Sequence, residues 1–279
     1  MTDATTTDGT TPEDPTPSSD PHTDDAPAAE IIPGAEPLSV AGGPAGALVL
    51  HGFTGNPQSM RGLAEAFAAA GFTVEMPLLP GHGTSIAHML RTDWSDWSAA
   101  AEAAYEDLAG RCESVVVAGL SMGGTLTLWL AERHPEIAGL VAVNPACPPP
   151  GSSAEVVAGL EALLESGQET MDAIGGDIAD PDARELAYEQ VPLRGLVSLM
   201  RNAEDVAAEV GSIRSPLLLM TSPEDHVVDP ANSDHLAAHV GGEVERVTLE
   251  RSYHVATLDH DKELVEEQAV AFARRVTGT

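Results

Sequence analysis

The stretch Val115-Val116-Val117-Ala118-Gly119-Leu120-Ser121-Met122-Gly123-Gly124 joins a strand pattern directly to the start of a helix. Three consecutive β-branched residues predict a fully buried strand, because they leave no polar side to face water. A helical pattern then runs from Thr125 to Arg133. The chain must therefore reverse within a few residues, and we expect the residue at the apex, Ser121, to have a strained backbone conformation.

Small residues surround Ser121, as such a turn requires. Gly119, Gly123 and Gly124 leave room for the helix to pack beneath the strand. This order of strand, serine and helix is the context in which a G-x-S-x-G sequence presents a nucleophilic serine. The motif alone is weak evidence, since a glycine-rich turn can carry a serine with no chemical role. The assignment of Ser121 as a nucleophile therefore depends on partners elsewhere in the chain.

The length and composition restrict the class of protein. A chain of 279 residues can bury a sizeable core, and we expect one domain with a small insertion. The two cysteines, Cys112 and Cys147, make no disulfide or metal-binding framework. No stretch reaches the ~20 apolar residues of a membrane span, and the N-terminus lacks the basic and apolar regions of a secretory signal. We therefore expect a cytoplasmic protein without an integral membrane segment.

The chain is strongly acidic, with 44 Asp and Glu residues against 13 Lys and Arg and a formal net charge of −31. Residues 1–37 contain nine of the acids and no base, which leaves 35 acids against 13 bases, a net −22, on the rest. Such a charge repels nucleic acid, so we expect no nucleic-acid partner. Two explanations stay open: a halophile with concentrated salt in its cytoplasm, or an acidic protein from a GC-rich genome, where lysine is scarce.

The distribution of apolar residues divides the chain into a tail, a core in two parts and an insertion. Residues 1–33 have hardly any large apolar side chains and are predicted to form a disordered acidic tail. Residues 34–147 and 213–279 alternate strand and helix patterns, which predicts an α/β fold with a mostly parallel central sheet and helices on both faces. Residues 148–212 show two amphipathic helix patterns and no convincing strand, and are predicted to form a helical cap insertion.

The predicted strands cover residues 37–40, 47–51, 72–76, 115–117, 138–143, 216–220 and 244–249. The predicted helices cover residues 58–70, 93–112, 125–133, 231–240 and 264–276, with two more at 156–164 and 193–200 in the insertion. Asp93 and Asp96 form a weak capping box at the start of one of these helices.

A nucleophilic serine needs a general base, and the base needs a carboxylate to orient it. In doubly wound sheets the active groups lie in loops that follow the carboxyl ends of strands. His254 directly follows the last predicted strand, so we assign it as the base. The loop after strand 216–220 offers Asp225 as the acid, with Glu224 and Asp229 as alternatives. The order serine, acid, histidine is the one expected of the α/β-hydrolase fold.

The oxyanion formed during acyl transfer needs two backbone N–H donors. One comes from the residue after the nucleophile, Met122, and the other from the loop after the early strand, at Phe53. Gly52 lets that loop lie close to the substrate. His51 and His82 are predicted to shape their loops and not to act as bases.

With these residues in place, the chain from Gly46 to Val276 resembles bacterial carboxylesterases and monoacylglycerol lipases of the α/β-hydrolase superfamily, in particular the small thermostable-carboxylesterase type with a compact cap. The matching segments are His51-Gly-Phe-Thr-Gly-Asn-Pro, Pro80-Gly-His-Gly-Thr, Gly119-Leu-Ser-Met-Gly-Gly, Ser222-Pro-Glu-Asp-His-Val-Val and Ser252-Tyr-His-Val-Ala-Thr-Leu-Asp. The acidic tail and the long, acid-rich cap depart from the family pattern.

The resemblance implies that Ser121 is the nucleophile, Asp225 the orienting acid and His254 the base, with Phe53 and Met122 as oxyanion donors. We therefore expect a serine hydrolase, without cofactor or metal, that cleaves short- to medium-chain esters or monoacylglycerols through an acyl-enzyme. The apolar sides of both cap helices are expected to face the acyl chain. A thioesterase or a cofactor-free perhydrolase would use the same triad, and a non-catalytic binding protein of this fold is a further alternative. The oligomeric state, monomer or dimer, stays open.

Overall fold

A seven-stranded sheet forms the centre of the protein in a computed structural model that describes residues 1–2, 30–173 and 176–279. The strand order is β1-β3-β2-β4-β5-β8-β9, and only β1 runs antiparallel to its neighbour. The strands are β1 (Leu38–Val40), β2 (Ala45–Leu50), β3 (Thr73–Met76), β4 (Ser114–Leu120), β5 (Gly139–Val143), β8 (Leu217–Thr221) and β9 (Val244–Thr248). The predicted fold class, an α/β-hydrolase fold with a mostly parallel sheet, is confirmed.

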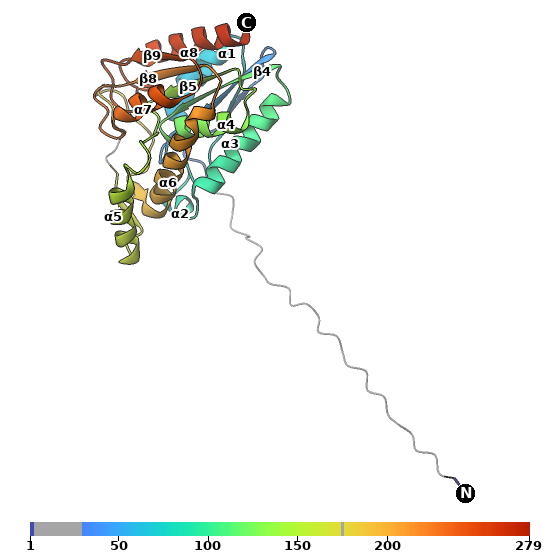
Figure 1. The fold of residues 1–279 in the computed structure, drawn as a ribbon, viewed down its shortest axis with the longest axis vertical. Helices are drawn as coiled ribbons and strands as arrows, with labels where there is room; N and C mark the ends of the chain where they lie inside the picture. The colour runs from blue at the N-terminus through green and yellow to red at the C-terminus, as the bar shows by residue number, and fades with distance from the viewer. Residues whose placement is uncertain (3–29, 174–175) are drawn as a thin grey trace.

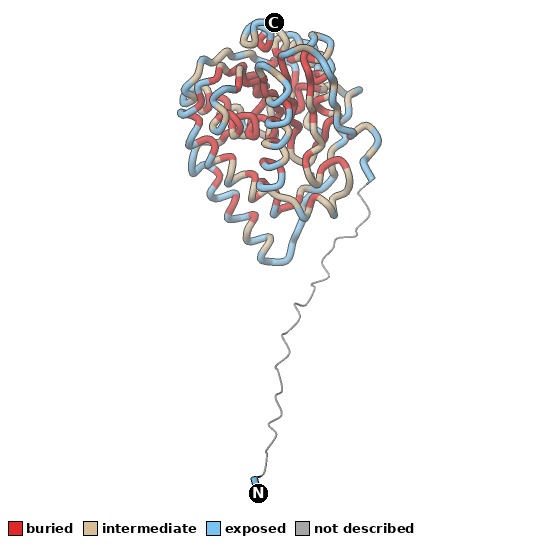
Figure 2. The backbone as a smooth tube through the Cα atoms, turned by 90° about the vertical axis from the view of Figure 1, so that its right-hand side faces the viewer, coloured by how far each residue is buried: buried red, intermediate tan, exposed pale blue. Residues whose placement is uncertain are grey.

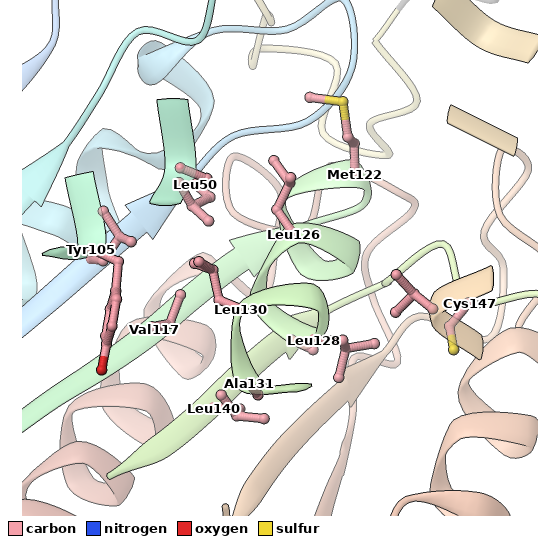
Figure 3. Packing of buried hydrophobic residues seen from close by; sticks show 14 of the residues in the cluster. Leu50, Tyr105, Val117, Met122, Leu126, Leu128, Leu130, Ala131, Leu140 and Cys147 are labelled. Atoms are coloured by element: carbon pink, nitrogen blue, oxygen red, sulfur yellow. The ribbon is translucent and has the colours of Figure 1, made fainter. Parts of the chain in front are cut away.

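Alternate residues of β4 belong to the hydrophobic cores on opposite faces of the sheet. Val115 and Val117 pack with residues of α3 and α4, whereas Val116 and Ala118 pack with residues of α1 and α8. Both faces are therefore covered, which explains why the strand has no polar side. The buried residues follow the sheet through the middle of the molecule (Figure 2). In Figure 3, Leu126 and Leu130 of α4 lie over the strands that carry Leu50 and Val117.

The helices outside the insertion are α1 (Arg61–Ala69), α2 (Ile86–Met89), α3 (Trp94–Ala109), α4 (Met122–Arg133), α7 (Ala231–His239) and α8 (Lys262–Thr277), with a 3₁₀ turn η1 (Pro57–Met60) before α1. The short helix α2 was not predicted, because four residues are too few for a helical period to be recognised. The predicted capping box is present at α3: Asp93 accepts from the backbone N–H of Ser95, and Asp96 accepts from that of Asp93. None of the described helices is long and apolar enough to cross a membrane.

The insertion between β5 and β8 forms a cap on one end of the core (Figure 1). It contains α5 (Ala154–Glu165), β6 (Thr170–Asp172), β7 (Gln190–Pro192) and α6 (Leu193–Glu209), followed by the 3₁₀ turn η2 (Val210–Ser212). The expectation of no strand in this segment was wrong, since β6 and β7 pair as a small antiparallel sheet. Strands of three residues are too short to show a period of two in the sequence. Most of the predicted disordered tail, residues 3–29, lies outside the described residues.

Candidate active site

Ser121 lies at the sharp turn between β4 and α4, with φ 56° and ψ −117°. For a residue other than glycine, such a backbone conformation raises the free energy of the folded state by on the order of 1–3 kcal/mol. The turn is possible because a Cβ at Gly119 would lie 2.1 Å from the backbone oxygen of Gly123. Helix α4 therefore begins directly against the end of β4, as the glycines in the sequence predict.

The imidazole of His254 and the carboxylate of Asp225 meet although they come from loops after different strands, β9 and β8. Nδ1 of His254 lies 2.7 Å from Oδ2 of Asp225. The other carboxylate oxygen accepts hydrogen bonds from the backbone N–H groups of Val227 and Val228, each at 2.8 Å. Both side chains are buried, with 8% of His254 and 1% of Asp225 exposed. This geometry places the proton on Nδ1 and leaves Nε2 able to accept one, as a general base requires.

The alternative acids do not contact this histidine. Oδ1 of Asp229 accepts a hydrogen bond at 2.9 Å from the backbone N–H of Ala231, the first residue of α7. Glu224 is exposed at the surface of the same loop. Among the three carboxylates of this loop, the structure brings only Asp225 to His254.

The predicted oxyanion donors lie on either side of the serine. Met122 begins α4, and Phe53 belongs to the loop after β2. That loop passes close to Ser121, since a Cβ added at Gly52 would lie 3.5 Å from the Cβ of Ser121. Among the described residues, neither backbone N–H has a hydrogen-bond partner outside its own helix or strand. Both groups are therefore able to donate to a substrate oxygen.

His51, which is buried in the core, holds the loop after β2 that carries Phe53, named here the oxyanion loop. Its Nδ1 donates to the backbone oxygen of Gly52 at 3.0 Å, and its Nε2 accepts from the backbone N–H of Leu79 at 3.1 Å. The ring of His82 packs against it with the ring centres 4.9 Å apart. Burial lowers the pKa of His51 to about 4 and the pKa of His82 well below its usual range. Two neutral, buried histidines of this kind shape loops, which is the role that we expected.

Ser121, His254 and Phe53 line a common cavity of about 420 Å³ beneath the cap. Its apolar wall comes from α6, through Leu196, Leu199, Met200 and Ala203, and from the small sheet, through Met171 and Val191. The expectation that both cap helices face the cavity was therefore wrong. The apolar side of α5 packs instead on α6, where Val157 and Leu160 contact Leu193 and Val197.

Three polar residues of the site were missed by the sequence reasoning. Asn144, at the end of β5 with φ 44°, donates through Nδ2 to the backbone oxygen of His254 at 2.8 Å and accepts from the N–H of Ser222 at 2.8 Å. Its position after a buried strand could have revealed it. Asp177 and Glu185 come from the cap and line the cavity. No local pattern of the cap sequence predicts their contacts, which are all with distant segments.

Glu185 places a carboxyl group near His254. Burial raises the pKa of Glu185, while the nearby His254 has a smaller opposite effect. Its Oε1 lies against the oxyanion loop, since a Cβ added at Gly55 would be 2.8 Å away. The carboxyl group makes no hydrogen bond with a described residue, and so it can meet a polar part of a substrate.

Within the described ranges there is no group of three or more His, Cys, Asp or Glu residues that could hold a metal ion. Cys112 and Cys147 are both free thiols, and burial raises the pKa of Cys147 to about 12.

The fold and the arrangement of Ser121, His254 and Asp225 define an α/β-hydrolase. A family model described as serine aminopeptidase, S33, matches residues 44–261, and the chain belongs to this family. It is 45% identical over 249 residues to a thermostable monoacylglycerol lipase of Bacillus sp. (strain H-257), covering 89% of this chain and 98% of that protein. It is 28% identical over 243 residues to a carboxylesterase of Bacillus subtilis (strain 168), covering 86% and 97%.

Solved structures agree with these relatives. A structure from a study of two metagenome-derived lipolytic enzymes, LipS and LipT, superimposes with a TM-score of 0.83 at 43% identity, covering 88% of this chain and 100% of that one. The predicted resemblance to bacterial carboxylesterases and monoacylglycerol lipases is confirmed, as is the predicted class of enzyme, an ester hydrolase.

Proposed function

We propose that this protein hydrolyses monoacylglycerols or esters of short to medium acyl chains through an acyl-enzyme formed on Ser121. The observation that carries the proposal is one cavity lined by Ser121, at a strained turn, and by His254, whose Nδ1 lies 2.7 Å from Oδ2 of Asp225. The lipase and carboxylesterase activities named for the two Bacillus relatives support this choice of substrates.

The chemistry follows from the positions of the groups. Oγ of Ser121 attacks the ester carbonyl while Nε2 of His254 takes its proton, and Asp225 orients and stabilises the resulting imidazolium. The backbone N–H groups of Met122 and Phe53 stabilise the oxyanion. His254 then protonates the departing alcohol, and a water molecule activated by the same histidine hydrolyses the acyl-enzyme.

The lining of the cavity suits both parts of a monoacylglycerol. The apolar wall of α6 can take the acyl chain, and the cavity volume of about 420 Å³ falls within the roughly 300–1,000 Å³ of ligand pockets. Glu185, beside His254, can accept hydrogen bonds from hydroxyl groups of the alcohol. A substrate with a polar alcohol and an apolar acyl chain therefore fits better than one that is apolar throughout.

A fluorophosphonate probe and a substrate series test this proposal together. We expect the probe to modify wild-type protein and not Ser121→Ala, whose kcat should fall by about 10⁴-fold or more because the triad acts as a unit. The substrates are monoacylglycerols and p-nitrophenyl esters of increasing chain length, with a triacylglycerol and an aminoacyl anilide as comparisons. Labelling that persists in Ser121→Ala would overturn the role of Ser121. Preferred cleavage of the anilide or of the triacylglycerol would overturn the proposed substrate class.

A further inference from the structure

The carboxylate of Asp177, in the cap, contacts both loops that carry the acid–base pair. Its Oδ2 accepts hydrogen bonds from the backbone N–H of His254 at 3.1 Å and from that of His226 at 3.0 Å. Its Oδ1 lies 2.9 Å from Nδ1 of the His226 ring. Its backbone oxygen accepts from the N–H of Val255 at 3.0 Å. One residue of the cap therefore joins the loop after β8 to the loop after β9.

These contacts lie next to the atoms that must stay aligned. His226 directly follows Asp225 in the chain, and the second donor is the backbone of His254 itself. The Asp177 side chain is only 9% exposed, so water competes little for these bonds. Hydrogen bonds from N–H groups to a carboxylate are roughly twice as strong as those between neutral groups. Asp177 is therefore able to fix the separation of the two loops.

The cap segment that carries Asp177 is itself fixed to the histidine loop by Asp259. This fully buried carboxylate accepts hydrogen bonds from the backbone N–H groups of Ala179 at 2.7 Å and Asp180 at 2.9 Å, both in the cap. It also accepts a hydrogen bond at 2.9 Å from the backbone N–H of Tyr253, which directly precedes His254. Burial alone would raise the pKa of Asp259, but these backbone donors together lower it below its usual value. The cap segment that carries Asp177 is thus itself bound to the histidine loop.

The peptide of His254 is held on both sides. On the cap side, the carboxylate of Asp177 accepts a hydrogen bond from the backbone N–H of His254. On the core side, Nδ2 of Asn144 donates a hydrogen bond to the backbone oxygen of His254 at 2.8 Å. Removal of the Asp177 carboxylate would leave the N–H of His254 without this acceptor while the contact with the core remains. The expected result is a small displacement of the histidine loop and not its unfolding.

We propose that Asp177 is a positioning residue of the cap, which fixes the position of the His254 loop relative to the Asp225 loop. This inference rests on the proposed roles of Ser121, His254 and Asp225. A displacement of about 1 Å in a catalytic group can cost about 10²-fold in rate. Asp177→Ala should accordingly lower kcat by about 30- to 100-fold, with KM changed less than about threefold. Asp177→Asn keeps an oxygen acceptor at the same position and should recover kcat to within about fivefold of wild type.

The test measures the rate and the extent of fluorophosphonate labelling separately. A purely structural role would lower the fraction of labelled protein and leave the rate constant of the remaining sites unchanged. A positioning role lowers the rate constant of labelling in proportion to kcat while every folded molecule still becomes labelled. Asp182→Ala is the matched control, because this exposed aspartate lies in the same cap segment and its side chain makes no hydrogen bond with a described residue.

We expect Asp177→Ala to label slowly and completely, and Asp182→Ala to label like wild type. Asp177→Ser, which is too short to replace the carboxylate, should behave like Asp177→Ala and serves in its place if the alanine variant does not fold. Wild-type rate constants in these two variants would overturn the role of Asp177 even where less protein is labelled. Failure of the wild type to label at Ser121 would instead overturn the proposed function, so the two failures are distinguishable.

Discussion

Replacement of Gly123 by alanine tests how closely α4 must pack against β2. A Cβ at this position would lie 2.1 Å from the backbone oxygen of Leu50 and 2.8 Å from that of His51. An ordinary carbon–oxygen contact is about 3.3 Å or more, so the backbones must separate by roughly 1.2 Å. Neither contact involves a side chain that could rotate away. Because β2 leads directly into the oxyanion loop, this separation displaces Phe53 from Ser121.

We expect the substitution to cost about 1–3 kcal/mol of folding free energy, the usual range for overpacking. At about 2–4 °C per kcal/mol for a protein of this size, Tm should fall by roughly 2–12 °C. The displaced oxyanion loop should lower kcat by about 10²-fold. The measurements are thermal unfolding followed by circular dichroism and ester hydrolysis at saturating substrate.

Gly159→Ala is the control for this prediction. Gly159 lies in α5, and apart from its chain neighbours and the nearby backbone of its own helix, no atom lies within 4 Å of the position that its Cβ would take. Alanine there should raise stability by about 0.5–1 kcal/mol through helix propensity alone, without a change in kcat. If Gly123→Ala kept Tm within about 1 °C of wild type and kcat within about twofold, the close packing of the turn would not matter as argued.

The acid, a partly buried glutamate and the net charge lead to three further predictions. Asp225→Asn should lower kcat by about 10³- to 10⁴-fold through the wrong histidine tautomer, and a larger loss in Asp229→Asn would assign the acid role to Asp229. Burial raises the pKa of Glu132 to about 7. The native state therefore binds this proton more tightly than the unfolded state, and its contribution to stability is lost as pH rises from about 4.5 through 7. Glu132→Gln should show a flatter decline of Tm from pH 5 to pH 8, and identical pH profiles would contradict this. Raising potassium chloride from about 0.05 M to 2 M shortens the Debye length and should raise Tm by more than about 10 °C; a flat or falling Tm would favour an ordinary acidic protein over a halophile.

The features that the sequence predicts correctly depend on neighbouring residues. The turn at Ser121 needs small residues at Gly119 and Gly123, and that requirement is visible within five positions. The central strands β2, β4, β5 and β8 are runs of mostly apolar, buried residues bounded by turns, so the sequence locates them within a few residues of their ends. The rule that active groups follow the carboxyl ends of strands leads to the prediction of His254 and three possible acids, and the structure places one of these acids, Asp225, against His254.

The features that the sequence does not predict depend on contacts between distant segments. Position after a strand leaves three possible acids; the family resemblance favours Asp225, and the structure brings its carboxylate to within 2.7 Å of His254 across two loops. An amphipathic pattern shows that α5 has an apolar side, but not that this side packs on α6 and leaves the cavity to α6. Asp177 has no apolar period or cap motif around it, because its partners are 49 and 77 residues away.

The contacts of the cap change how its role should be understood. An insertion that only covered the substrate would need apolar contacts with the acyl chain and few bonds with the catalytic loops. The segment after β6 instead bonds to the histidine loop through Asp177 and Asp259, and Tyr188 bonds to the backbone oxygen of Thr54 in the oxyanion loop. These bonds fix two loops of the core, one after β9 and one after β2. The alignment of the active site therefore depends on the cap as well as on the sheet, and substitution of the cap residues that make these bonds should alter kcat as well as substrate preference.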